Sequence, residues 1–135
     1  MRGRRRAEIA AVLDASALAA FLLRERGYEV VRPIVHRSAI STVNLGELLV
    51  VLGRRGEDAA AIMDALQARE IQVRPYTVGH ALRAAEIDAQ VNRKGALSLG
   101  DRACLALAQE LGVPAFTADS VWEELQLPVE IRRIR

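Results

Sequence analysis

The sequence has little cysteine and few aromatic residues, and it has no long hydrophobic run. Its one cysteine, Cys104, excludes an internal disulfide bond and a zinc site built on several cysteines, as in proteins of reducing compartments. Aromatic residues make up 4% of the chain, so base stacking can contribute little to any binding. No apolar run approaches the roughly 20 residues that span a bilayer, and acids interrupt the N-terminal apolar segment where a signal peptide would be hydrophobic. We therefore expect a cytoplasmic protein.

The chain does have enough apolar residues for one domain. Of its 135 residues 51% are hydrophobic and 27% are charged, which is typical of a globular protein with a core of aliphatic side chains. The formal net charge is +2, but four arginines in the first six positions supply more than that, so the rest carries a small net negative charge. We expect a basic tail over residues 1–8 and a single domain over residues 9–135. Contact with nucleic acid, a disordered solubilising end and a start assigned too far before Val12 are three explanations of such a tail.

Short apolar runs alternate with helical patterns along the chain. The predicted strands are residues 10–13, 38–41, 71–77, 113–118 and 129–134, and the predicted helices are residues 17–27, 44–56, 57–69, 78–95 and 98–112. We expect Gly27 and Gly95 to end their helices, and Pro33 leaves residues 28–37 open between a short helix and a bend. This alternation predicts a parallel sheet covered by helices on both faces, joined by right-handed crossovers.

Four acidic residues lie where predicted strands end or the next helices begin. Asp14 directly follows the first strand, and Asp119 follows the strand in "VPAFTA". Glu47 lies in the first turns of the helix after "SAIS", and Asp101 lies in the first turn of the helix after "GALS". All strands of a parallel sheet point their carboxyl ends at the same edge, where ligands bind. We therefore expect the four carboxylates to converge.

Such a cluster of carboxylates needs a compensating cation, because like charges suppress one another's ionisation. Oxygen ligands without several cysteines or paired histidines favour a hard ion, Mg²⁺ or Mn²⁺, held by one or two carboxylates directly and by the others through water. The N-termini of helices add partial positive charge. A site of this kind can polarise a phosphodiester, activate water and stabilise the leaving oxygen.

Each acid also has a structural explanation. Asp14 fits the N-cap of the first helix. In three other places a Ser or Asn precedes an acid by three residues, as in a capping box: Ser98 with Asp101, Asn44 with Glu47, and Ser120 with Glu123. Taken singly, the capping and functional explanations stay open. The position of one acid in every turn that faces the same sheet edge favours function.

Four segments together resemble a known family. In order and content, "VLDASALAAFLL", "ISTVNLGELL", "GALSLGDRACLALAQELGVPAFTAD" and the following "SVW" resemble the PIN-domain ribonucleases, and most closely the VapC-type toxins of bacterial toxin–antitoxin pairs. The resemblance extends from Val12 to the last predicted strand. "LSLGDRACLALA" followed by "TAD" is its most specific part. The lead "MRGRRRAEIAA" is longer than is usual in the family, and the segment around Pro33 is hard to align.

The resemblance implies a three-layer α/β/α PIN-like domain with a mostly parallel central sheet of four to five strands. It implies Mg²⁺- or Mn²⁺-dependent cleavage of RNA by an activated water molecule, a homodimer, and inhibition by a cognate antitoxin protein. By position it assigns the family's catalytic, metal-binding acids to Asp14, Glu47, Asp101 and Asp119. Asp119 matches the least constant of the four. Ser16 and Thr117 resemble the hydroxyl residues that support the cluster.

A few other polar residues have two explanations each. The candidate contacts for RNA phosphates are Arg93, Lys94 and Arg102. Arg102 suits a solvated helix face better, and the other two lie at a helix end, where cations complement the helix dipole. His36 and His80 have no obvious nucleophile to serve, so we expect structural or surface roles for them, and the apolar setting of Cys104 favours the core.

Two other functions stay open. A PIN-fold nuclease that processes RNA without an antitoxin would share the same site. A non-catalytic α/β module for binding or signalling belongs to another class. A receiver-like domain would carry adjacent acids after the first strand, where this chain has Leu13 before Asp14. No glycine-rich nucleotide-binding pattern is present, which argues against a nucleotide site.

Overall fold

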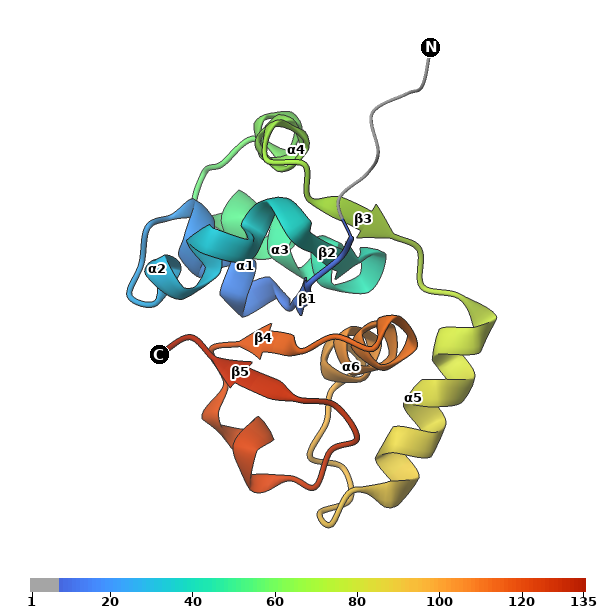
Figure 1. The fold of residues 1–135 in the computed structure, drawn as a ribbon. Helices are drawn as coiled ribbons and strands as arrows, with labels where there is room; N and C mark the ends of the chain where they lie inside the picture. The colour runs from blue at the N-terminus through green and yellow to red at the C-terminus, as the bar shows by residue number, and fades with distance from the viewer. Residues whose placement is uncertain (1–7) are drawn as a thin grey trace.

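A five-stranded parallel sheet forms the centre of the computed structural model, which describes residues 8–135 (Figure 1). The strands are β1 (Ala11–Leu13), β2 (Ser38–Ser41), β3 (Gln72–Arg74), β4 (Ala115–Thr117) and β5 (Ile131–Arg133). Their order is β3-β2-β1-β4-β5, and every neighbouring pair is parallel. This sheet confirms the predicted fold class. The basic tail predicted for residues 1–8 lies, apart from Glu8, outside the described residues.

Helices cover both faces of the sheet. They are α1 (Ala15–Leu22), α2 (Tyr28–Val31), α3 (Thr42–Arg54), α4 (Ala59–Ala68), α5 (Val78–Gln90) and α6 (Leu99–Leu111), with 3₁₀ segments η1 (Arg32–Arg37) and η2 (Ser120–Glu124). Helices α1 to α4 lie on one side of the sheet and α5 and α6 on the other (Figure 1), so the chain forms the three layers expected of an α/β/α fold. None of the helices in residues 8–135 has the length and apolar character needed to cross a membrane.

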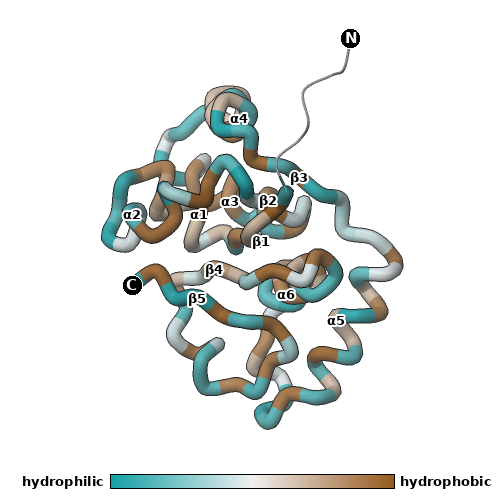
Figure 2. The backbone as a smooth tube through the Cα atoms, in the orientation of Figure 1, coloured by the Kyte–Doolittle hydropathy of each residue, from teal (hydrophilic) through white to brown (hydrophobic). Residues whose placement is uncertain are grey.

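The pleat of β1 divides the core into two halves. Ala11 and Leu13 belong to the apolar cluster under α1, α3 and α4, whereas Val12 packs with α5 and α6. Side chains alternate between the faces of a strand, so one short strand supports both layers. Along the outer helix α5, apolar and hydrophilic stretches alternate (Figure 2), as expected for a helix that packs with one face on the rest of the domain.

The ends of α1 and α5 differ from the sequence-based expectation, and the structure decides the segment around Pro33, which the sequence left open. Helix α1 ends at Leu22 instead of continuing to Gly27, and Gly27 is the N-cap of α2 with φ +99°. The segment around Pro33 is helical throughout: α2 gives way to η1 at Arg32, and the proline occupies the first turn of η1, where its missing N–H is tolerated. Helix α5 ends at Gln90, before the predicted stop at Gly95.

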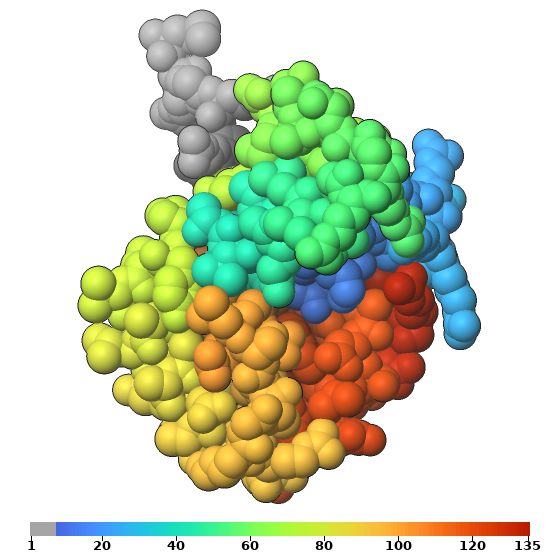
Figure 3. All heavy atoms as spheres, turned by 180° about the vertical axis from the view of Figure 1, so that it is seen from behind, coloured from blue at the N-terminus to red at the C-terminus, as the bar shows by residue number. Residues whose placement is uncertain are grey.

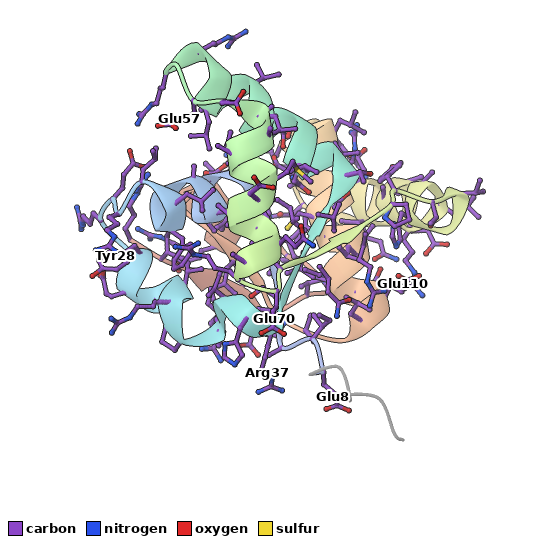
Figure 4. All side chains as sticks on the ribbon, turned by 90° about the horizontal axis from the view of Figure 1, so that it is seen from above. Glu8, Tyr28, Arg37, Glu57, Glu70 and Glu110 are labelled. Atoms are coloured by element: carbon purple, nitrogen blue, oxygen red, sulfur yellow. The ribbon has the colours of Figure 1, made fainter. Side chains whose placement is uncertain are left out.

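The structure confirms the roles expected for the two histidines and the cysteine. His36 is exposed, and Cys104 is fully buried in α6. His80 is buried and closes a capping box with Thr77 at the start of α5, while its Nε2 lies 2.9 Å from Glu110 Oε1. Figure 4, seen from above, shows Glu110 at the edge where α6 meets α5. His80 therefore joins two helices and serves a structural purpose.

The C-terminal segment packs against the turn before α2. The side chain of Ile134 is 4% exposed and belongs to the core, and Arg135 donates to the carbonyl oxygen of Arg26. A Cβ built on Gly27 would lie 2.5 Å from the carbonyl oxygen of Ile134. The absence of a side chain at Gly27 thus allows the last strand to reach the first helical layer.

We expect Gly27→Ala to destabilise the protein more than Gly56→Ala. Both glycines have positive φ, so alanine costs about 1–2 kcal/mol at either position. Only at Gly27 would the new Cβ also overlap backbone, because no atom lies within 4 Å of a Cβ at Gly56. Urea unfolding of the two variants measures the difference. Equal losses of unfolding free energy would mean that the C-terminal segment does not hold this turn.

Candidate active site

The strand order places a crevice at the carboxyl ends of β1 and β4. From the central β1 the chain continues outward to β2 and β3 on one side, and β4 and β5 lie on the other. Ligands of open α/β sheets bind where the order reverses in this way. Asp14 immediately follows β1, and Asp119 lies two residues beyond the last residue of β4. Two of the four predicted acids therefore flank this point.

A pocket of about 340 Å³ lies at this edge of the sheet. All four predicted acids line it: Asp14, Glu47, Asp101 and Asp119. Ser16 and Asn44 add polar groups, and side chains of α1 and α3 form apolar walls. Seen from behind, the start of α1 (blue), α3 (teal), the start of α6 (orange) and the segment after β4 (red-orange) meet on one face (Figure 3). The predicted convergence is thus present, although the metal-binding roles of these residues stay predictions.

The carboxylate of Asp14 lies at the centre of a hydrogen-bond network. Its Oδ1 accepts from the hydroxyl of Ser16 at 2.7 Å and from the backbone N–H of Ala17 at 2.8 Å. Its Oδ2 accepts from the hydroxyl of Thr117 at 2.5 Å. The two hydroxyls in turn accept from backbone N–H groups after β4, those of Ala118 and Asp119. Ser16 and Thr117, predicted as supporting hydroxyls, therefore tie the turn after β1 to the turn after β4.

Burial changes the acidity of Asp14. Asp14 is only 7% exposed, and this burial raises the pKa of its carboxyl group from 3.8 to about 6. The donors from Thr117, Ala17 and Ser16 oppose that rise in pKa, and the negative charge of Asp101 adds to it. Asp14 and Asp101 are thus close enough for their charges to interact.

Asp101 and Ser98 form a reciprocal capping box at the start of α6. The backbone N–H of Asp101 donates to Ser98 Oγ at 3.1 Å, and the N–H of Ser98 donates to Asp101 Oδ2 at 3.0 Å. The structure therefore confirms the predicted cap, and the same side chain lines the pocket. Because only one carboxylate oxygen makes the cap, capping does not exclude a second role.

Glu47 reaches the pocket from α3 and lies against the first turn of α6. Its Oε1 accepts from Asn44 Nδ2 at 3.1 Å, and the same amide group donates to the carbonyl oxygen of Gly100 at 3.0 Å. A Cβ built on Gly100 would overlap both carboxylate oxygens of Glu47 and lie 2.6 Å from Cδ. The bare Cα of Gly100 thus provides the space in which this carboxylate lies.

Two of the predicted capping pairs are wrong. Helix α3 is capped by Ser41, so Asn44 lies inside the first turn and does not cap with Glu47. The cap of η2 is Asp119, whose Oδ1 accepts from the N–H of Val121 at 2.9 Å, in place of the predicted Ser120. The residues that do cap these helices, Ser41 and Asp119, have the extended backbone conformation that a cap requires.

The donor set suits a hard divalent cation. Within the part of the chain that is described, no three Asp, Glu, His or Cys side chains lie close enough to bind one metal ion together. Mg²⁺, however, keeps several waters and needs only one or two carboxylates. Hydrogen bonds among residues 8–135 leave one carboxylate oxygen free in each of Glu47, Asp101 and Asp119. The polar side chains that line the pocket offer carboxylate, hydroxyl and amide oxygens and neither sulfur nor imidazole, as Mg²⁺ or Mn²⁺ prefers.

The predicted basic contacts lie elsewhere. Arg93 pairs with Glu124 at 3.6 Å, and Lys94 donates to the backbone of α5. Arg102 lies 3.9 Å from Asp88 and donates to the carbonyl oxygen of Leu97. None of the three lines the acidic pocket, so the structure does not bring them together with the acids, and their contact with RNA stays a prediction.

Sequence reasoning missed the roles of Asn44 and Gly100. The sequence pattern assigns Asn44 only to a helix cap and gives no role to Gly100. The spacing of three between Asn44 and Glu47 indicates one face of a helix, which could have suggested contact between them. The partner across the pocket, Gly100, is 56 positions away from Asn44, and no local pattern indicates it.

We expect Asp14→Asn to stabilise the metal-free protein at neutral pH. The folded chain holds a proton on Asp14 up to about pH 6, whereas the unfolded chain releases it near 3.8. The contribution of Asp14 to folding stability therefore falls as the pH rises from about 4 to about 6. The variant, which cannot ionise, should be more stable by about 3 kcal/mol near pH 7.5 and by much less near pH 4. Urea unfolding at both pH values checks this, and a gain of equal size at both would attribute the effect to packing instead of ionisation.

Comparison with solved structures shows the same architecture in other proteins. The toxin-antitoxin complex from Klebsiella pneumoniae contains a chain 19% identical to this one, with a TM-score of 0.69 over 82% of this chain and 88% of that one. A chain of the DNA-bound VapBC from Salmonella typhimurium is 20% identical, with a TM-score of 0.70 over 94% and 99%. A chain of VapBC2 from Rickettsia felis, bound to a DNA fragment from its promoter, is 14% identical, with a TM-score of 0.71 over 93% and 98%. At these identities the likeness is one of fold.

The sequence itself assigns the family. No curated protein sequence matches the chain. Residues 11–126, however, match the PIN domain, and this range extends from β1 to η2, includes four of the five strands and contains all four acids of the pocket. The match agrees with the resemblance carried by the sequence motifs, and the chain belongs to the PIN domain family.

Proposed function

We propose that this protein is a metal-dependent endoribonuclease that hydrolyses RNA phosphodiester bonds with Mg²⁺ or Mn²⁺. The observation that carries the proposal is the pocket at the carboxyl ends of β1 and β4, which four acids from four different segments line in a member of the PIN domain family. Helix capping explains Asp14, Asp101 and Asp119 one at a time. It does not explain why these three acids and Glu47 line the same pocket.

The acids of the pocket have two proposed roles: one fixes the ends of the central strands, and all of them bind the metal ion. Asp14, whose Oδ2 accepts a single hydrogen bond and keeps a second lone pair, anchors the floor, and it would hold the ion together with Glu47, Asp101 and Asp119, directly or through water. When bound, a divalent ion would polarise the phosphodiester and activate water for attack on phosphorus. The N-termini of α1 and α6 add partial positive charge beside these carboxylates.

Attack by water, and not by a protein nucleophile, fits the surroundings of Cys104. Burial raises the pKa of its thiol well above the usual value, and the charges of Asp14, Asp101 and Glu47 raise it further. The thiol is fully buried and stays protonated, so it cannot serve as a nucleophile.

The protein partner that we propose is an antitoxin. This rests on the likeness in fold to chains of toxin–antitoxin complexes. Val51 lines the acidic pocket and is 46% exposed, and its neighbour Val50 is 52% exposed, so a protein bound to this side of α3 would cover the pocket. A homodimer and a cytoplasmic location stay predictions. An RNA-processing nuclease without an antitoxin would share the site, and a small protein from a neighbouring reading frame that blocks cleavage would favour the toxin.

We expect the purified protein to cleave a structured RNA pool with Mg²⁺ or Mn²⁺ and to stop on addition of EDTA. Asp14→Asn and Asp101→Asn should lower the rate at least about 100-fold, since each removes a charge from the metal site. Asp58→Asn is the matched control, because Asp58 caps α4 with its side chain but lies outside the pocket. Cleavage is measured on proteins shown by circular dichroism to be folded.

Other outcomes of that assay contradict the proposal. The same background from all four proteins would mean that the acids only cap helices. Loss of activity in Asp58→Asn as well would attribute the losses to helix stability. Full activity in the presence of EDTA would exclude the metal.

We expect Gly100→Ala to reduce cleavage without loss of stability. A Cβ at this position would displace the carboxylate of Glu47, whereas alanine in place of a helical glycine stabilises a helix by up to about 1 kcal/mol. Gly46→Ala is the control, since Gly46 precedes Glu47 in α3 and no atom lies within 4 Å of its built Cβ. Rates about tenfold lower in Gly100→Ala alone, with a melting temperature at or above that of the unsubstituted protein, are expected. Equal rates in both variants would show that the position of Glu47 does not matter.

A further inference from the structure

One buried amide joins the acid of α3 to the first turn of α6. Asn44 is 1% exposed and lines the acidic pocket. Its Nδ2 donates one hydrogen bond to Glu47 Oε1 within α3 and another to the carbonyl oxygen of Gly100 in α6. Gly100 directly precedes Asp101, whose own position the capping box with Ser98 sets. The Glu47 carboxylate is thus linked through Asn44 to the residue that directly precedes Asp101 in α6.

The chemistry of its neighbours determines the orientation of this amide. A carboxylate and a backbone carbonyl are acceptors only, so both contacts require the NH₂ group of Asn44. A flipped amide would place Oδ1 against two other oxygens. In the orientation found, Oδ1 is buried and has no hydrogen-bond partner among residues 8–135.

The unpaired oxygen separates two explanations for the asparagine. A buried acceptor without a partner destabilises the folded state. Leucine has a similar branched shape and would fill the same space without that cost, and the neighbours Leu45 and Leu48 of α3 are buried apolar residues. Packing therefore does not require an amide here. What only the amide supplies is the pair of donors to Glu47 and to Gly100.

We propose that Asn44 is a positioning residue for Glu47. It holds the Glu47 carboxylate over the bare Cα of Gly100, next to Asp101, so that acids from α3 and α6 present their free oxygens to the same cation. This inference rests on the proposed function, because it assigns Asn44 a role in the metal site of that enzyme. Asn44 itself would act only through Glu47. It is not one of the four acids that the sequence motifs indicate.

The test uses two substitutions with opposite effects on packing. Asn44→Leu fills the space and removes the unpaired oxygen, whereas Asn44→Ala leaves a cavity. Both remove the two donors. Ser38→Ala is the control, since Ser38 is a fully buried polar residue that donates to the carbonyl oxygen of Ile34 and lies outside the pocket. Mn²⁺ binding to the metal-free proteins is measured by calorimetry, together with thermal stability, and cleavage is measured as kcat and KM.

We expect Mn²⁺ affinity to fall about tenfold or more in both Asn44 variants, as when residues that orient metal ligands are replaced. The melting temperature should stay the same or rise in Asn44→Leu and should fall in Asn44→Ala. In both, kcat should fall while KM for RNA changes by less than about twofold, since the amide does not contact the substrate. Ser38→Ala should lose stability and keep its Mn²⁺ affinity.

Three results would overturn the inference. Mn²⁺ affinity within about twofold of the unsubstituted protein in both variants excludes a role for Asn44 and leaves the proposed nuclease intact. If Mn²⁺ affinity falls only in the variant whose melting temperature also falls, or if neither variant folds, the amide is a structural element of the α3–α6 contact. An unsubstituted protein that binds no Mn²⁺ overturns the metal site itself, and that result is distinct from the other two.

Discussion

The buried carboxylate of Asp14 is the interaction on which the rest of the site depends. Three donors hold it, and the two hydroxyls among them also accept from backbone groups beyond β4. One side chain therefore caps α1, joins the ends of the two central strands and forms the floor of the pocket. Burial of this group raises its pKa to about 6, which means that folding places a carboxylate where ionisation is unfavourable. A cation bound in the pocket would relieve that cost.

Capping and metal binding are compatible roles for these acids. A carboxylate has two oxygens with several acceptor positions, and a cap needs only one of them. Asp101 and Asp119 each use one oxygen to satisfy a free N–H at a helix start, and the other remains available. Because helices begin where parallel strands end, residues that cap them already lie at the ligand-binding edge. The cap then fixes the direction of the side chain, which a metal ligand requires.

Much of this arrangement was predictable from local patterns. Short apolar runs alternating with helical patterns predicted five parallel strands, and the position of the acids predicted one shared edge. The less predictable features depend on contacts between distant segments. The sequence predicts that Gly27 ends a helix. In the structure its missing side chain allows the backbone of Ile134 to approach this turn closely. The predicted cap at Asn44 failed because Ser41, the last residue of β2, already occupies that position.

The sequence by itself determined the fold class, the family and which four carboxylates meet, since these follow from strand periodicity, motif order and the common direction of parallel strands. Only the tertiary structure decided how the carboxylates are held. The amide of Asn44 and the bare Cα of Gly100 are far apart in the chain, and they meet because α3 packs on α6. A hydrogen bond between distant segments depends on distances of a few tenths of an ångström, and no local preference of the chain specifies those.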